Sequence, residues 1–359
     1  MTYKTISKTD SEFKRYLDGD FSNTYIALPV KSLNIETEAE TVTFEVVPKS
    51  DIHRPAFFIF LEKLFKLRSF HMILVPMFFV FAKNYVDDRI FDSSSFFYST
   101  VAMIFLFASL NLLNDYNDHI SGYDRIIETK KGPIQKGWIT ALEVKHLSWI
   151  LLFVAAFLAR PVLFAQHEAL HVVVFVIVLF MAGQFFKKNS YKNQRAGEFI
   201  LFLLMGPALA SGFQVSMGAG IDTEILAFGF LWGACILFLN YLHHFSYLLM
   251  TSQAGIKNTM TRLGFDPAKK FLMFWLLAIN ILWLLFHYFY ASVFWTWMTT
   301  ITLVFWTIPT IISLNSIASP VGSDLLQALK KGYRNYYLMC GLLILEMTWY
   351  IGVKLNWMV

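Results

Sequence analysis

The chain has 359 residues, of which 56% are hydrophobic and 18% aromatic, and only 15% are charged. A soluble globular chain of this length does not need so many apolar side chains, so the composition predicts a polytopic membrane protein. Its two cysteines, Cys235 and Cys340, lie inside apolar runs, which excludes a disulfide framework and a cysteine metal site. The net charge of +5 carries little information until the cations are placed along the chain.

The first 55 residues are polar and mixed in charge, and they show no evident cleavable signal peptide. They predict a short cytoplasmic extension, residues 1–55, in front of a membrane domain over residues 56–359. Alternating apolar and polar side chains over Thr41–Val47 predict one strand. The stretch Ser32–Pro48 is too short for a stable domain of its own. An amphipathic helix over Pro55–Arg68, with three cations, is predicted to lie at the membrane interface.

Nine apolar runs follow, most of them long enough to cross about 30 Å of hydrocarbon as helices. They predict an all-α polytopic membrane protein, a bundle of about nine transmembrane helices. The runs cover about 70–86, 96–113, 145–165, 168–186, 198–217, 223–250, 270–290, 293–315 and 334–353.

The cations predict the orientation of this bundle. Sixteen Lys and Arg side chains lie in alternate connections between the runs, and only Lys83, Arg89 and Arg160 lie in the others. The positive-inside rule therefore places the sixteen, together with the N-terminus, in the cytoplasm, and an odd number of spans places the C-terminus outside. We expect an integral protein of the inner (cytoplasmic) membrane of a bacterium.

The second apolar run ends in Asn114, Asp115 and Asp118, and Asp124 follows six residues later. If the helix continues, Asp115 and Asp118 share a face, and Gly122 lets the chain leave the helix and fold back. Anions at the C-terminal end of a helix are unfavourable unless a cation lies among them, and oxygen ligands of this kind suit Mg²⁺. The alternative is a solvated acidic loop between two membrane helices.

The pattern Asn-Asp-x-x-Asp-x-x-x-x-x-Asp resembles the first Asp-rich motif of the UbiA superfamily of intramembrane prenyltransferases. Gly132, Pro133 and the segment 135–140 are similar to the 1,4-dihydroxy-2-naphthoate polyprenyltransferase branch, which belongs to menaquinone biosynthesis. The resemblance implies a bundle of nine membrane helices. It also implies an Mg²⁺-dependent enzyme that moves a polyprenyl group from its diphosphate to an aromatic acceptor of the quinone-precursor type.

The same resemblance implies roles for the residues of this motif. Asp115, Asp118 and Asp124 are expected to bind the metal, with Asp115 and Asp118 counted as catalytic. Asn114 is expected to bind the diphosphate. His119 is interpreted as a satisfied polar residue in preference to a phosphate ligand.

The connection after the fourth run is similar to the family segment in which Tyr and Lys precede a Gly-Glu pair that opens the fifth helix. Tyr191 and Lys192 are therefore expected to be catalytic, and Lys192 and Arg195 to bind the diphosphate. Positive-inside anchoring is the alternative for the two cations. Glu198 falls at a helix start, where an anion is favoured, so a structural role suits it equally.

The region after the sixth run departs from the family, which has a second Asp-rich motif there. The residues that surround this motif in the family are present here and are called the frame of the motif. They include Lys257 and Arg262 as expected diphosphate ligands, but the aspartates of the motif are absent. Asn240, His243 and His244 are the candidate replacements, although imidazole is a poor ligand for Mg²⁺. Three explanations stay open: a one-metal site, a different donor, or a protein that has lost catalysis and keeps lipid binding.

Three classes of function follow. The leading hypothesis is a prenyltransferase whose apolar interior holds the isoprenoid tail, with the bilayer and no nucleic acid as a further partner. The alternative is a catalytically impaired relative that binds isoprenoids or quinones or acts as a partner subunit. A transporter is a weaker alternative, because the sequence shows neither a convincing internal repeat nor mid-membrane charges.

Overall fold

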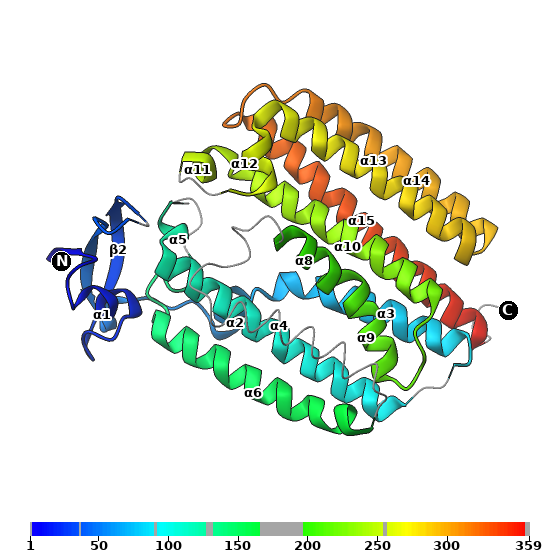
Figure 1. Ribbon diagram of the computed structural model, residues 1–359, viewed down its shortest axis with the longest axis horizontal. Helices are drawn as coiled ribbons and strands as arrows, with labels where there is room; N and C mark the ends of the chain where they lie inside the picture. Colours follow the sequence, from blue (N-terminus) through cyan, green and yellow to red (C-terminus); the bar gives the residue numbers. More distant parts are fainter. Residues whose placement is uncertain are drawn as a thin grey trace. The chain divides into compact units, whose positions relative to one another are not determined.

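The computed structural model describes residues 2–35, 37–89, 92–126, 132–165, 197–253 and 257–355. The chain forms two compact units, residues 1–70 with 101–159 and residues 71–100 with 160–359. Figure 1 colours the chain from the N-terminus in blue to the C-terminus in red and labels the α-helices and strand β2.

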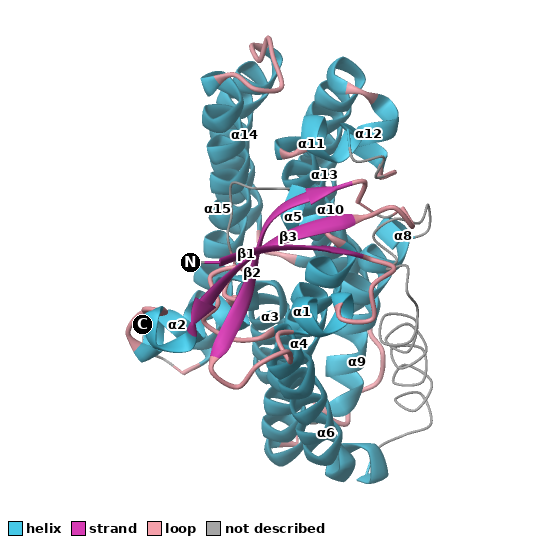
Figure 2. Ribbon diagram, turned by 90° about the vertical axis from the view of Figure 1, so that its left-hand side faces the viewer, coloured by secondary structure: helices cyan, strands magenta, loops and turns pink. Residues whose placement is uncertain are grey.

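The first unit contains a three-stranded antiparallel sheet, drawn in magenta in Figure 2, formed by β1 (Thr2–Ser7), β2 (Tyr25–Leu33) and β3 (Thr41–Pro48). Its strand order is β1-β3-β2, so β3 is central and β2 is an edge strand. The register between β2 and β3 shifts between Pro29 and Lys31. Proline has no amide hydrogen to give to a ladder, so an edge strand with a bulge suits it.

Helix α1 (Phe13–Asp18) covers this sheet and closes a small hydrophobic core. Ile120 of α4 (Ser93–Ser121) packs against the same core. The strand predicted over Thr41–Val47 is confirmed, but the sequence did not predict the two strands that pair with it. The buried core residues are Ile6, Phe13, Leu17, Ala27, Val42 and Phe44.

The other helices of this unit are the interfacial helix, two membrane helices and a short helix between them. The helix predicted over Pro55–Arg68 is present as α2 (Phe57–Phe65), followed by the 3₁₀ turn η2 (Leu67–Phe70). The Asp-rich segment continues α4, the four-residue helix α5 (Tyr123–Ile126) comes next, and α6 (Ala141–Ala165) completes the unit's helices. Because α4 ends at Ser121, the predicted exit at Gly122 is confirmed, and Gly122 has a φ of +86°.

The second unit is helical throughout its described residues. Its helices are α3 (His71–Val86), α8 (Gly197–Leu203), η4 (Leu204–Ala208), α9 (Leu209–Ser216), α10 (Thr223–Ser246), α11 (Leu248–Gln253), α12 (Thr259–Leu263), α13 (Phe265–Tyr290), α14 (Val293–Asn315) and α15 (Ser323–Lys354).

Among the described membrane spans α10 is the most buried, and its glycines form a close helix contact. A Cβ atom on Gly206 of η4 would lie 2.4 Å from the carbonyl oxygen of Gly229, and one on Gly233 would lie 2.6 Å from the carbonyl oxygen of Phe202. Glycines four residues apart let helix backbones approach closely in a membrane. The π-helical turn η4 contains Pro207, whose missing amide hydrogen disfavours regular α-helix there.

Eight helical segments among the described residues are long and apolar enough to cross a membrane. They correspond to eight of the nine predicted runs, and the remaining run, 168–186, lies outside the described residues. The prediction of an all-α polytopic bundle is thus confirmed for the membrane part of the chain, to which the N-terminal sheet is an addition. The segments are Leu67–Val86, Ser93–Ser121, Ala141–Phe164, Gly197–Ser216, Thr223–Ser246, Phe265–Tyr290, Val293–Asn315 and Ser323–Lys354.

Candidate functional site

The carboxylates of the Asp-rich segment come from two helices joined by a single turn. Asp115 and Asp118 lie three residues apart in the last two turns of α4, so they project from one side of it. The left-handed φ of Gly122 then reverses the chain, and Asp124 lies in the first turn of α5. Local sequence therefore explains why Asp115 and Asp118 share one helix and why Asp124 lies on the next.

One cation of the interfacial helix reaches this segment. Lys66 ends α2 with a left-handed φ of +53°, and its ammonium group forms an ion pair with the carboxylate of Asp115. Burial by itself would lower the pKa of Lys66, but Asp115, followed by Asp118 and Asp124, outweighs burial and raises this pKa above its ordinary value of 10.5. The negative potential of all three carboxylates thus reaches the same ammonium group.

This donor set fits Mg²⁺ bound together with a diphosphate better than a metal held by protein alone. The three carboxylates and the Asn114 side-chain carbonyl offer only oxygen ligands, and the ammonium group of Lys66 already pairs with Asp115. In the described parts of the chain, no three His, Cys, Asp or Glu side chains come together closely enough to hold a metal ion. Mg²⁺ commonly takes one or two protein carboxylates and completes its shell with phosphate oxygens and water.

His119 faces the N-terminal residues. It is 2% exposed, and its Nε2 lies 3.1 Å from the carbonyl oxygen of Leu17. This contact agrees with its interpretation as a buried polar residue in preference to a phosphate ligand.

In the second unit, the frame of the missing Asp-rich motif is held by hydrogen bonds. The side chain of Asn258 caps α12 by accepting from the amide of Thr261 at 2.9 Å, and its Nδ2 lies 3.3 Å from Nδ1 of His244. Glu198, in the first turn of α8, accepts hydrogen bonds from the amide and the hydroxyl of Thr259. Glu198 therefore joins α8 to the start of α12, and His244 is hydrogen-bonded to the capping residue of the same helix.

The other candidates near this frame differ in exposure. Asn240 is half-buried, whereas His243, Lys257 and Arg262 are exposed. The ring of His243 lies 5.9 Å from that of His244. The remaining predicted site residues, Tyr191, Lys192 and Arg195, lie outside the described residues.

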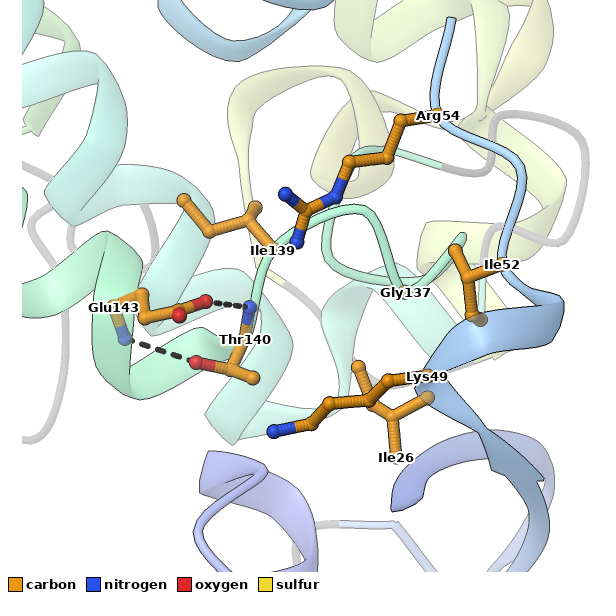
Figure 3. A pocket seen from close by; sticks show the side chains of 8 residues that line it. All are labelled: Ile26, Lys49, Ile52, Arg54, Gly137, Ile139, Thr140 and Glu143. Carbon is orange, nitrogen blue, oxygen red and sulfur yellow. Dashed lines mark hydrogen bonds between the residues drawn. The ribbon is translucent and has the colours of Figure 1, made fainter. Parts of the chain in front are cut away.

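A small cavity of about 90 Å³ lies in the first unit, away from the Asp-rich segment. Figure 3 shows the Thr140–Glu143 capping box on its wall, in which each residue's amide donates to the other's side chain. No residue of the Asp-rich segment lines this cavity, so we do not assign the diphosphate to it. The lining residues are Ile26, Lys49, Ile52, Arg54, Gly137, Ile139, Thr140 and Glu143.

The sequence model of the UbiA prenyltransferase family matches residues 73–329, which is more than half of the chain. The chain belongs to the UbiA prenyltransferase family. The match begins after the N-terminal sheet and ends within α15, so it covers most of the membrane part of the chain. No curated protein sequence matches this chain.

Solved structures of the UbiA type share the fold. A UbiA homolog from Archaeoglobus fulgidus bound to GPP and Mg²⁺ has a TM-score of 0.55 and 14% identity, covering 80% of this chain and 99% of that one. The same homolog bound to DMAPP and Mg²⁺ has a TM-score of 0.56 at the same identity and coverage. A digeranylgeranylglyceryl phosphate synthase has a TM-score of 0.54 and 16% identity, covering 81% and 98%. Identities this low establish a common fold and leave the substrate to be argued from the site.

Sequence reasoning missed two buried pairs of ionisable side chains. Nε2 of His287 in α13 lies 2.9 Å from the carboxylate of Glu346 in α15, and both side chains are almost fully buried. Glu40 and Arg125 form the other pair, at 2.6 Å. For His287 and Glu346 a signal was present, because an ionisable residue inside an apolar run needs a partner in the bundle.

Proposed function

We propose that this chain is an intramembrane prenyltransferase that moves a polyprenyl group from its diphosphate to an aromatic acceptor, with Mg²⁺ as cofactor. The observation that carries the proposal is the ion pair between Lys66 and Asp115 at the end of an apolar helix that also carries Asp118, with Asp124 on the short helix after the turn. Membership of the UbiA family supports it, as do related structures bound to prenyl diphosphates and Mg²⁺.

In this proposal the Asp-rich segment holds the donor headgroup. Asp115, Asp118 and Asp124 would hold Mg²⁺, which neutralises charge on the departing diphosphate when it is bound. Asn114 would donate an amide hydrogen to a phosphate oxygen. Lys66 keeps the Asp115 carboxylate paired while no metal is bound. The cations expected to neutralise the rest of the diphosphate are Lys192, Arg195, Lys257 and Arg262.

The reaction replaces one bond to the allylic carbon by another. The C–O bond breaks, and its electron pair leaves with the diphosphate. A ring carbon of the acceptor then gives an electron pair to form the bond to the allylic carbon. The same ring carbon loses a proton or, where it carries a carboxylate, carbon dioxide, and the electron pair of the broken bond stays in the ring and restores its aromaticity. Aromatic side chains stabilise an allylic cation through their faces and exclude water. The segment 132–140 favours 1,4-dihydroxy-2-naphthoate as the acceptor, and hence a step of menaquinone biosynthesis.

The frame in the second unit favours one alternative. His244 is hydrogen-bonded to the residue that caps α12, and no carboxylate stands among the three candidate replacements. Because imidazole is a poor ligand for Mg²⁺, a relative that binds isoprenoids or quinones without turnover is the second candidate function.

The experiment that distinguishes a prenyltransferase from a binding protein without turnover uses purified protein in detergent. Radiolabelled farnesyl and longer polyprenyl diphosphates are incubated with dihydroxynaphthoate and Mg²⁺, and lipid-soluble product is counted. We expect product that disappears with EDTA. Asp118→Asn should lower turnover by at least about a hundredfold with an unchanged melting temperature, because metal-ligand oxygens are needed only for the reaction.

Asp266→Asn is the matched control, since the Asp266 side chain is 74% exposed and its loss should leave turnover unchanged. A fully active Asp118→Asn variant would contradict the metal role. Tight donor binding without product from any donor would favour the binding protein.

A further inference from the structure

The N-terminal domain, defined here as residues 2–55, packs directly on the Asp-rich segment within the first unit. Ile120, which lies between Asp118 and Asp124 in the sequence, packs against the domain's hydrophobic core. Nε2 of His119 lies 3.1 Å from the carbonyl oxygen of Leu17. Consecutive residues of the segment are therefore anchored to the domain by an apolar and a polar contact.

A buried ion pair ties the domain to the residue that follows Asp124. Nη2 of Arg125 lies 2.6 Å from the carboxylate of Glu40, and the two side chains are only 4% and 5% exposed. Nη1 of the same guanidinium donates to the carbonyl oxygen of His119 at 2.7 Å. Arg125 thus fixes both ends of the turn between α4 and α5 to one carboxylate of the N-terminal domain.

Two glycines, one on each side of Asp124 in the sequence, pack against isoleucine side chains of the domain. A Cβ atom on Gly122 would lie 2.7 Å from Cγ2 of Ile35, and one on Gly137 would lie 2.8 Å from Cδ1 of Ile52. Both glycines have a positive φ, which other residues rarely adopt. The domain therefore contacts the chain before and after Asp124, and a larger residue at either glycine would require an isoleucine side chain to shift.

Of the three carboxylates, Asp124 depends most on contacts outside its own helix for its position. It follows a turn and lies on the four-residue helix α5, which is too short to be stable by itself. Its carbonyl oxygen accepts a hydrogen bond from Nε2 of Gln135 at 2.7 Å, and its neighbour Arg125 is held by Glu40. Residues that hold metal ligands in place without contacting the metal typically contribute about 10–100-fold to metal affinity or activity.

We propose that the N-terminal domain is a positioning domain for the carboxylates, in which Glu40 acts through Arg125 to place Asp124 relative to Asp115 and Asp118. The inference rests on the proposed function, because it concerns the same metal and diphosphate ligands. Glu40 is a positioning residue, and it contacts neither donor nor acceptor in this proposal.

The test uses the full chain in detergent and two readouts. The first is the Mg²⁺ concentration that gives half-maximal transfer. The second is the rise in melting temperature with Mg²⁺ in the presence of inorganic diphosphate, which reports binding without turnover. Glu40→Gln keeps the shape and removes the charge, and we expect it to raise the required Mg²⁺ about tenfold in both readouts. Glu40→Asp should restore part of this loss.

Glu12→Gln is the matched control. It removes a 2.6 Å ion pair to Lys4 in the same domain, but these side chains are 46% and 48% exposed, so the Mg²⁺ dependence should not change. Arg125→Lys is measured in parallel in case Glu40→Gln does not fold, because lysine keeps the charge but lacks the forked donors. It should shift the Mg²⁺ dependence in the same direction, by several-fold.

The outcomes separate this inference from the proposed function. A folded Glu40→Gln protein with unchanged Mg²⁺ dependence overturns the inference, as does a loss of turnover at all Mg²⁺ concentrations without a shift. Both results leave the proposed function intact if Asp118→Asn is inactive. If Asp118→Asn is fully active, the proposed function fails whatever Glu40→Gln does.

Discussion

At the residue scale, the pairing of Lys66 with Asp115 places an internal cation where a metal would compete for the same oxygens. The carboxylates raise the pKa of Lys66, so this pairing stabilises the folded chain below the ordinary pKa of 10.5 and is lost only as the pH rises through the higher, folded value. Lys66 therefore stays charged through the neutral range, and in the proposed site Mg²⁺ would have to displace it from Asp115.

We expect Lys66→Met to lower the Mg²⁺ concentration required for binding with inorganic diphosphate, by several-fold. An ion pair at the protein surface contributes up to about 1 kcal/mol, and about 1.4 kcal/mol corresponds to a tenfold change in affinity. The measurement is the melting temperature against Mg²⁺ at pH 7.5. Lys63→Met, on the exposed side of α2, is the control and should change nothing. A higher Mg²⁺ requirement in Lys66→Met would instead make Lys66 a diphosphate ligand.

Part of this arrangement could be predicted from the sequence. The spacing of Asp115 and Asp118 and the break at Gly122 are local properties, and the structure confirms both. The partner of Asp115 is 49 residues away, and its direction depends on the left-handed φ of Lys66. No periodicity in the sequence reports such a contact, so Lys66 was read only as a cation of an interfacial helix.

At the scale of elements, length and hydropathy predicted the membrane helices, whereas the sheet was largely missed. Long apolar runs have no alternative to helix in a bilayer, so the eight described spans follow from composition. The sheet depends on pairings between distant strands, and Ile120 of a membrane helix completes its core. Only β3 alternates clearly enough to be recognised alone.

The close contact between η4 and the glycines of α10 is expected to be needed for stability. We expect Gly206→Ala to destabilise the protein by about 1–3 kcal/mol, because its Cβ would meet backbone atoms of α10 that cannot move aside. The readouts are the melting temperature and the monodisperse fraction on size-exclusion chromatography. Gly341→Ala is the matched control in α15, where a Cβ meets nothing within 4 Å and helix propensity favours alanine. Equal melting temperatures for the two variants would contradict the close contact seen here.

At the scale of the whole molecule, contacts in the second unit bear on the topology. Lys354, at the end of α15, forms an ion pair with Asp88, which follows α3. The ends of α15 and α3 at these two residues therefore lie together. The charges of the connections predict an odd number of crossings, with the C-terminus on the opposite side of the membrane from the N-terminus.

We expect single cysteines to report this topology with a membrane-impermeant maleimide. Asn23→Cys, in the N-terminal domain, should react only after the cells are lysed, whereas Gly220→Cys, in the connection between α9 and α10, should react in intact cells. The background is low, because the native Cys235 and Cys340 are only 1% and 6% exposed. Labelling of Asn23→Cys in intact cells would place the N-terminal domain and the adjoining carboxylates outside, away from a cytoplasmic supply of prenyl diphosphate. That result would contradict both the orientation and the proposed supply of donor, whereas the expected pattern puts the positioning domain and the donor in the same compartment.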